Sequence, residues 1–226
     1  MNIKISPESF ITKNFLLLAF LLLANITGIV TTYFFQHDYI FGLVPLFNFD
    51  REMNVPTLYS AAAIILASIL LFKISLLHKK HQAPYIAWLG LGCIFVFLAI
   101  DEASVLHENL IVPVRETLDT SGLLFYAWVI PYGIGLLVFL AIYSKFLLNL
   151  PPRTRWLFIL SGSIFVIGAI GFELLGGQHA EIHGRNNLMY TVFYTCEEFL
   201  EMSGIALFNY ALFSQLNQLE AQYAES

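Results

Sequence analysis

Three glutamates occupy positions 197, 198 and 201 inside one long apolar stretch. Between Arg185 and the C-terminus the sequence has no lysine or arginine that could neutralise them. An ionised carboxylate at the centre of a bilayer costs about 2.5–3.5 kcal/mol even on translocon-insertion scales. Acids in such a place therefore indicate a shared partner, which could be a metal ion, a set of protons or a substrate.

The same kinds of residue recur in two other apolar stretches, one around Asp101 and one around Glu173. Clustered carboxylates with nearby imidazoles suit a borderline or hard cation such as iron, manganese or zinc. A divalent ion would also offset the repulsion between the packed acids, as it does in dimetal carboxylate bundles. The predicted metal ligands are Asp101, His107, Glu108, Glu173, His179, His183, Glu198 and Glu201.

The candidate catalytic residues are Glu102, Glu197 and Ser104. A glutamate beside a bound metal can act as the base that activates water. Ser104 could be a nucleophile beside His107, although a helical serine more commonly bonds its own backbone. Neither Glu-x-x-His nor His-Glu-x-x-His occurs in the sequence, so the metal prediction rests on composition rather than on a motif.

The favoured hypothesis is a membrane-embedded, metal-dependent enzyme, either a hydrolase or an oxidoreductase, acting on a lipid or other apolar substrate. Two alternatives stay open. Repelling carboxyl groups can hold protons, as they do in a proton-coupled carrier of small molecules or ions. Neutral carboxyl groups can also bridge helices in a non-catalytic assembly or sensor subunit, and a homo-oligomer is compatible with each of these functions.

The amino-acid composition indicates an integral membrane protein. Of the 226 residues 58% are hydrophobic and only 12% are charged, whereas soluble domains average about 25% charged residues. The formal net charge of -5 argues against a nucleic-acid partner. Cys93 and Cys196, the only cysteines, lie in apolar stretches and predict neither a disulfide framework nor a thiolate zinc site.

We expect an all-α, polytopic bundle that forms a single integral-membrane domain over residues 1–226. A spanning helix needs about 20 mostly apolar residues. The first apolar run lacks a clear cleavage site, so we interpret it as a retained span. Six runs qualify, at 14–35, 57–77, 84–106, 123–148, 155–176 and 188–214.

The cations predict the topology. With both termini cytoplasmic, the inner flanks hold eight of them (Lys4, Lys13, Lys73, Lys79, Lys80, Lys145, Arg153 and Arg155) and the outer loops hold three (Arg51, Arg115 and Arg185). This asymmetry follows the positive-inside rule. It places the acids of the third, fifth and sixth spans in the outer half of the bilayer, where they could converge.

Several local expectations follow from this arrangement. Pro131 should kink the fourth span, and Gly176-Gly177 should end the fifth. Residues 177–186 should form a loop over the outer face, so that His179 and His183 have ligand spacing only if this loop is helical. Arg185 should be the counter-charge of the acids, and Tyr190 and Tyr194 should reach Glu197 and Glu198. His107 should point away from Asp101 if its helix continues, but can turn inward if the helix ends near Leu106.

Three patches of sequence resemble a group of bacterial six-span membrane proteins. They are Phe97-Leu98-Ala99-Ile100-Asp101-Glu102 leading to His107-Glu108, Leu150-Pro151-Pro152-Arg153-Thr154-Arg155 leading to Gly171-Phe172-Glu173, and Cys196-Glu197-Glu198 leading to Glu201-Met202-Ser203-Gly204. The resemblance covers most of residues 46–212. It implies a multi-pass protein of the bacterial inner membrane and carries no activity over.

Overall fold

A computed structural model describes residues 6–224, and within them the chain folds entirely into helices and their connections. Lys4 lies outside the described residues. The predicted all-α fold is therefore confirmed.

Five helical segments are long and apolar enough to cross a membrane. Large apolar side chains such as Leu16, Leu137 and Ile142 are exposed on these segments, as lipid-facing residues are expected to be. The segments are α1 (Pro7–Phe35), α3 (Val55–Lys80), α4 (Ile86–Ser104), α6 (Val129–Leu148) and the continuous segment Pro152–His183, which comprises α7 (Pro152–Val166), the π-helix η4 (Ile167–Phe172) and α8 (Glu173–His183).

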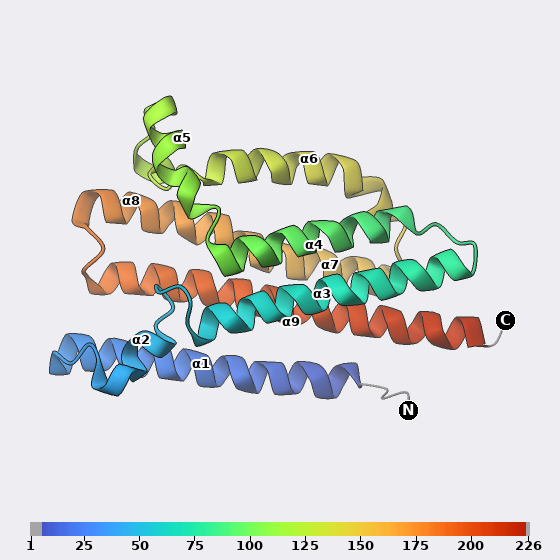
Figure 1. The fold of residues 1–226 in the computed structure, drawn as a ribbon, viewed down its shortest axis with the longest axis horizontal. Helices are drawn as coiled ribbons and strands as arrows, with labels where there is room; N and C mark the ends of the chain where they lie inside the picture. Colours follow the sequence, from blue (N-terminus) through green and yellow to red (C-terminus); the bar gives the residue numbers. More distant parts are fainter. Residues whose placement is uncertain (1–5, 225–226) are drawn as a thin grey trace.

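The sixth predicted span lies within the last helix, α9 (Leu188–Ala224), which is not among these five segments. Its four glutamates and buried amides such as Asn209 and Gln215 make it more polar than the others. This helix runs through the middle of the bundle and packs against α1, α3, α7, η4 and α8 (Figure 1). The most polar long helix is therefore the one surrounded by other helices.

The start of α1 and the end of α9 lie at the same end of the bundle, together with the α3–α4 connection (Figure 1). The opposite end carries α2 (Leu43–Phe47), α5 (Ile111–Leu118) and the α8–α9 turn (Figure 1). Two short 3-10 helices connect these parts, η1 (Ile40–Gly42) before α2 and η2 (Glu108–Leu110) before α5, and a third, η3 (Gly122–Leu124), precedes α6.

The helix starts follow from local chemistry. The side chain of Ser6 accepts the backbone N–H of Ser9, and that of Asn54 accepts the N–H of Thr57, so each residue caps the helix that begins after it. Prolines stand in the first turns of α1, α3 and α7, where the missing N–H has no helical partner to lose.

Two expected irregularities are wrong. Pro131 is the third residue of α6, so it lies in the first turn and removes no interior hydrogen bond. The fifth span does not end at Gly176-Gly177, because α8 continues to His183. A Cβ at Gly177 would lie 2.9 Å from the Tyr126 ring, which shows that this glycine serves close packing rather than helix termination.

Candidate functional site

Six glutamates from separate elements interact electrostatically with one another in the interior of the bundle. All six are only partly accessible to solvent. The acid cluster, as we call it, consists of Glu52 before α3, Glu102 on α4, Glu173 at the start of α8, and Glu197, Glu198 and Glu201 on α9. The structure therefore brings together the acids of three predicted spans.

Glu173 and Glu197 form the most direct contact within the acid cluster. Their carboxyl groups are close enough to share a hydrogen bond. Two ionised carboxylates only accept hydrogen bonds, so a hydrogen bond between these two groups would need a proton on one of them. The indole Nε1–H of Trp128 donates to Oε1 of Glu173 at 2.5 Å, which provides one neutral donor for the pair.

Two glycines bring the helices close enough for these contacts. A Cβ at Gly168, in η4, would lie 2.7 Å from the carbonyl oxygen of Glu197 and 3.1 Å from the backbone nitrogen of Glu201. A Cβ at Gly204 would lie 2.8 Å from the backbone nitrogen of Phe165. Backbone meets backbone at both places, so larger residues would push α9 away from the α7–η4 segment.

A second group of polar side chains, Asp101, His107 and Tyr132, forms where α4 ends. Val105 takes a left-handed conformation (φ 55°) that ends the helix after Ser104 and turns the chain back. The backbone N–H of His107 then donates to Oδ1 of Asp101 at 2.9 Å, and its ring Nδ1 lies 3.2 Å from Oδ2. The hydroxyl of Tyr132 donates to the same Oδ1 at 2.9 Å. Of the two orientations considered for His107, the inward one is observed.

The His107 imidazole lies against an aromatic ring as well as against Asp101. Its ring centroid lies 4.7 Å from that of Trp128, the residue that donates to Glu173. Burial alone lowers the pKa of His107, but the hydrogen bond and negative charge of Asp101 outweigh burial, so the pKa lies above its ordinary value. Glu102 and Glu108 act in the same direction. Burial likewise raises the pKa of Glu52, in the connection before α3.

The structure separates several predicted site residues from the acid cluster. Ser104 is exposed and donates its hydroxyl to the carbonyl of Ile100. Glu108 is exposed as well, although it still interacts electrostatically with Glu52 and Glu173. His179 and His183 do lie one helical turn apart, with ring centroids 4.7 Å from each other, because their segment is helical. They stand six and ten residues beyond Glu173, roughly 9 and 15 Å along the axis at about 1.5 Å per residue.

Nε2 of His179 bonds to Oδ1 of Asn187 at 2.7 Å. In the part of the chain that the structure describes, no three His, Cys, Asp or Glu side chains are placed together as a metal site requires. Seven of the eight predicted ligands are thus divided among the acid cluster, the Asp101–His107 pair and the end of α8, and Glu108 lies exposed at the start of η2.

Arg185 is not the counter-charge of the acid cluster. Its guanidinium lies 5.0 Å from the centre of the Tyr126 ring, and the acid that acts on it most strongly is Asp50. The hydroxyl of Tyr190 lies 3.1 Å from that of Tyr126 and within hydrogen-bonding reach of Asp50. Tyr190 therefore faces this group rather than Glu197 and Glu198.

Residues 15–216 match a protein family described as Domain of unknown function (DUF8692). The chain belongs to this family. The DUF8692 match extends from α1 to the greater part of α9 and includes the acid cluster and the Asp101–His107 pair. Neither a curated protein nor a solved structure matches the chain.

The DUF8692 site also contains residues that sequence reasoning did not select. No role was predicted for Glu52, Trp128, Tyr132 or Tyr126. A signal was present for two of them: Trp128 and Tyr132 are four residues apart and would share a face at the start of a helix. Nothing in the sequence indicated that this face meets Glu173 and Asp101.

Proposed function

We propose that this chain is a proton-coupled membrane carrier in which the acid cluster holds and transfers the protons. The contact between Glu173 and Glu197 supports the proposal most directly, because two carboxyl groups hydrogen-bond only when a proton lies between them. None of the cluster's members makes a salt bridge with lysine or arginine within residues 6–224. Binding of protons is the simplest way to reduce the repulsion between neighbouring carboxylates in such a group.

A row of groups able to donate and accept protons connects the acid cluster with the end of the bundle. Tyr126 lies beside Glu173, its hydroxyl bonds to that of Tyr190, and Tyr190 reaches Asp50 in the connection before α3. Chains of carboxyl and hydroxyl groups of this kind carry protons in pumps and carriers. The row gives the cluster a route for exchange with water.

Proteoliposomes that contain a pH-sensitive dye test the proposal. We expect at least one solute from a panel of alkali cations, amino acids and organic acids to drive proton movement through the wild-type protein. Glu197→Gln should abolish the movement, whereas Glu116→Gln, which changes an exposed acid on α5, should not. Absence of a response to every solute, or full activity of Glu197→Gln, would reject a proton-coupled carrier.

A metal-dependent enzyme is the second candidate, and the Asp101–His107 pair favours it. A carboxylate that binds one ring nitrogen of a histidine orients the other nitrogen toward a metal, and outer partners of this kind are common at metal sites. His107 also interacts electrostatically with Glu102. Iron, manganese or zinc held by these residues would activate water or oxygen near a lipid substrate.

Elemental analysis of detergent-purified protein distinguishes this candidate from the first. A metal enzyme should retain close to one equivalent or more of iron, manganese or zinc, and Glu198→Gln should reduce that content. A metal content far below one equivalent that Glu198→Gln leaves unchanged would reject it.

We further propose that the protein resides in the bacterial inner membrane with both termini in the cytoplasm. The resemblance to bacterial six-span proteins supports the location in the bacterial inner membrane. The position of the start of α1 and the end of α9 beside the α3–α4 connection, where Lys79 and Lys80 stand, supports the orientation (Figure 1). Labelling of single cysteines with a membrane-impermeant reagent tests this: position 80 should be protected in intact cells and position 116 should react.

A further inference from the structure

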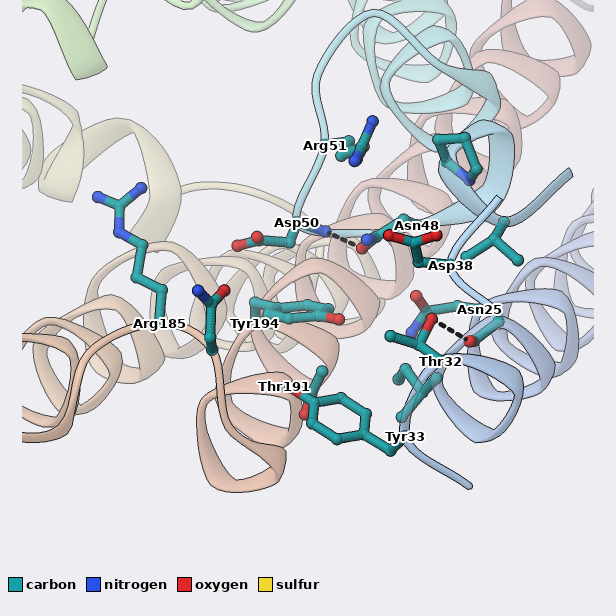
Figure 2. Close-up of a pocket in the computed structure, with 15 residues that line it drawn as sticks. Asn25, Thr32, Tyr33, Asp38, Asn48, Asp50, Arg51, Arg185, Thr191 and Tyr194 are labelled. Atoms are coloured by element: carbon teal, nitrogen blue, oxygen red, sulfur yellow. Dashed lines mark hydrogen bonds between the residues drawn. The ribbon is translucent and has the colours of Figure 1, made fainter. Parts of the chain in front are cut away.

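A polar cavity of about 240 Å³ lies between α1, α2, the connection before α3 and the start of α9 (Figure 2). None of the six glutamates of the acid cluster lines it, and Asp50, the outer end of the proposed proton row, is the one residue of that row in its wall. Among its lining residues are two arginines and two aspartates: Arg51, Arg185, Asp38 and Asp50. An opening at this end of a membrane bundle faces the depth of the lipid headgroups.

The arginines are the donors left free to bind a ligand there. Within residues 6–224 neither Arg51 nor Arg185 makes a salt bridge with a carboxylate. Arg185 only stacks on the Tyr126 ring. Each guanidinium carries five N–H donors in a planar fork that matches the oxygens of phosphate or carboxylate.

Three other polar side chains that line the cavity already make hydrogen bonds within the protein. Asn25 accepts the backbone N–H of Phe49 at 3.1 Å and donates to the hydroxyl of Thr195 at 3.0 Å. Asn48 accepts the backbone N–H of Asp50 at 2.9 Å, and Thr32 donates to the carbonyl of Gly28 at 2.9 Å (Figure 2). These bonds hold part of the cavity wall in place, and the two arginines are its positively charged donors.

Exposed apolar side chains occur in the chain segment between the lining residues Tyr33 and Val44. Phe34 and Phe35, at the end of α1, are 73% and 66% exposed, and Phe41, in the connection to α2, is 96% exposed. Side chains of this kind at the end of a spanning helix are suited to contact acyl chains. The cavity is smaller than the roughly 300–1,000 Å³ of drug-sized pockets, so it suits a headgroup rather than a whole lipid.

We propose that the cavity binds a phosphate ester through Arg51 and Arg185. The phosphate can belong to a phospholipid whose chains lie along Phe34, Phe35 and Phe41, or to a soluble phosphate monoester. Asp38 and Asp50 keep the site from being uniformly positive and oppose the binding of a negatively charged group. The site does not depend on the proposed transfer of protons.

Native mass spectrometry of the full chain in detergent tests this with three probes. Phosphatidylglycerol carries the phosphate and the chains, diacylglycerol lacks the phosphate, and glycerol phosphate lacks the chains. We expect the wild type to bind phosphatidylglycerol at least about tenfold more tightly than diacylglycerol, as charge-assisted hydrogen bonds imply. Arg51→Gln with Arg185→Gln should remove this preference, and Arg115→Gln, an arginine on α5 outside the cavity, should keep it.

The glycerol phosphate arm identifies the source of the phosphate. If glycerol phosphate at matched concentration displaces bound phosphatidylglycerol, the natural ligand is a soluble phosphate ester. If only another phospholipid displaces it, the natural ligand is a phospholipid. Asp38→Asn should strengthen binding because it removes a negative charge, and a damaged fold would not produce a gain. Equal binding of phosphatidylglycerol and diacylglycerol to the wild type, or an unchanged preference in the double variant, would overturn the proposal.

Discussion

Asp101 binds His107 through both of its carboxylate oxygens, one to the backbone N–H at 2.9 Å and one facing the ring Nδ1 at 3.2 Å. The two residues are six positions apart, a spacing that an uninterrupted helix would place on different faces. The left-handed residue Val105 makes the contact possible by ending α4. One turn of backbone thus creates both the end of a span and an oriented imidazole beside the acid cluster.

This pair should make the stability of the protein depend on pH. The pKa of His107 is raised in the folded state, so its stabilising effect is fully present below the unfolded value of about 6.5 and is lost as the pH rises through the folded value. Thermal unfolding in detergent should show a larger advantage of wild type over His107→Gln at about pH 6 than at about pH 9. His37→Gln, which changes an exposed histidine, is the control. An advantage that is equal at the two pH values would contradict the raised pKa.

Trp128→Phe should destabilise the protein because it removes the N–H that Glu173 accepts while leaving the carboxyl group in the interior. The expected cost is about 1–3 kcal/mol, the usual penalty for a buried polar group that loses its partner. A fall in the thermal midpoint would report it. Trp156→Phe changes a side chain that is 65% exposed and should leave the midpoint nearly unchanged. Similar midpoints for the two variants would show that the Trp128 bond contributes little.

Gly168→Ala should separate η4 from α9. The new Cβ would meet backbone atoms of Glu197 and Glu201, which cannot rotate away, so we expect a loss of about 1–3 kcal/mol, as for other overpacked interiors. Gly162→Ala is a matched control on α7, because a Cβ there meets nothing within 4 Å. That change should be neutral or stabilising by up to about 1 kcal/mol through helix propensity. The close approach would be disproved by equal effects of the two substitutions.

Glu197→Gln should leave the fold intact while removing a protonated carboxyl group. The glutamine amide can still donate to Glu173, so the contact between the side chains survives. Infrared spectroscopy at neutral pH should show a weaker band of protonated carboxyl groups than in the wild type. Glu116→Gln should leave that band unchanged. A wild-type spectrum without such a band would mean that the pair holds no proton.

The helices were predictable because their signals are local. The second span was expected at 57–77 and is observed as Val55–Lys80, and the third was expected at 84–106 and is observed as Ile86–Ser104. Runs of apolar residues and the prolines and amides before them determine such segments. The fourth span was expected to start at 123 but begins at Val129, because an apolar run does not distinguish a 3-10 turn from a spanning helix.

The candidate site was predictable only in part, since it depends on which helix faces meet. Glu102, Glu173 and the glutamates of α9 were expected to converge, and the structure places them together. The histidines of α8 were expected beside them but lie further along the helix axis, because that helix passes through Gly176-Gly177. Glu52 joins from a connection whose path depends on tertiary contacts such as the bond from Phe49 to Asn25.

The π-helix η4 has a consequence for every residue that follows it in the same segment. Its turns hold one residue more than α-helical turns do, so Glu173 and the rest of α8 are rotated by roughly 100° from the face that an unbroken α-helix would give them. A deletion of one residue between 167 and 172 would turn Glu173 away from Trp128 while keeping every side chain on α7 in place. The number of residues in this segment therefore matters as much as their identity. An insertion or deletion here would change the side-chain contacts in the interior, whereas a surface loop would tolerate it.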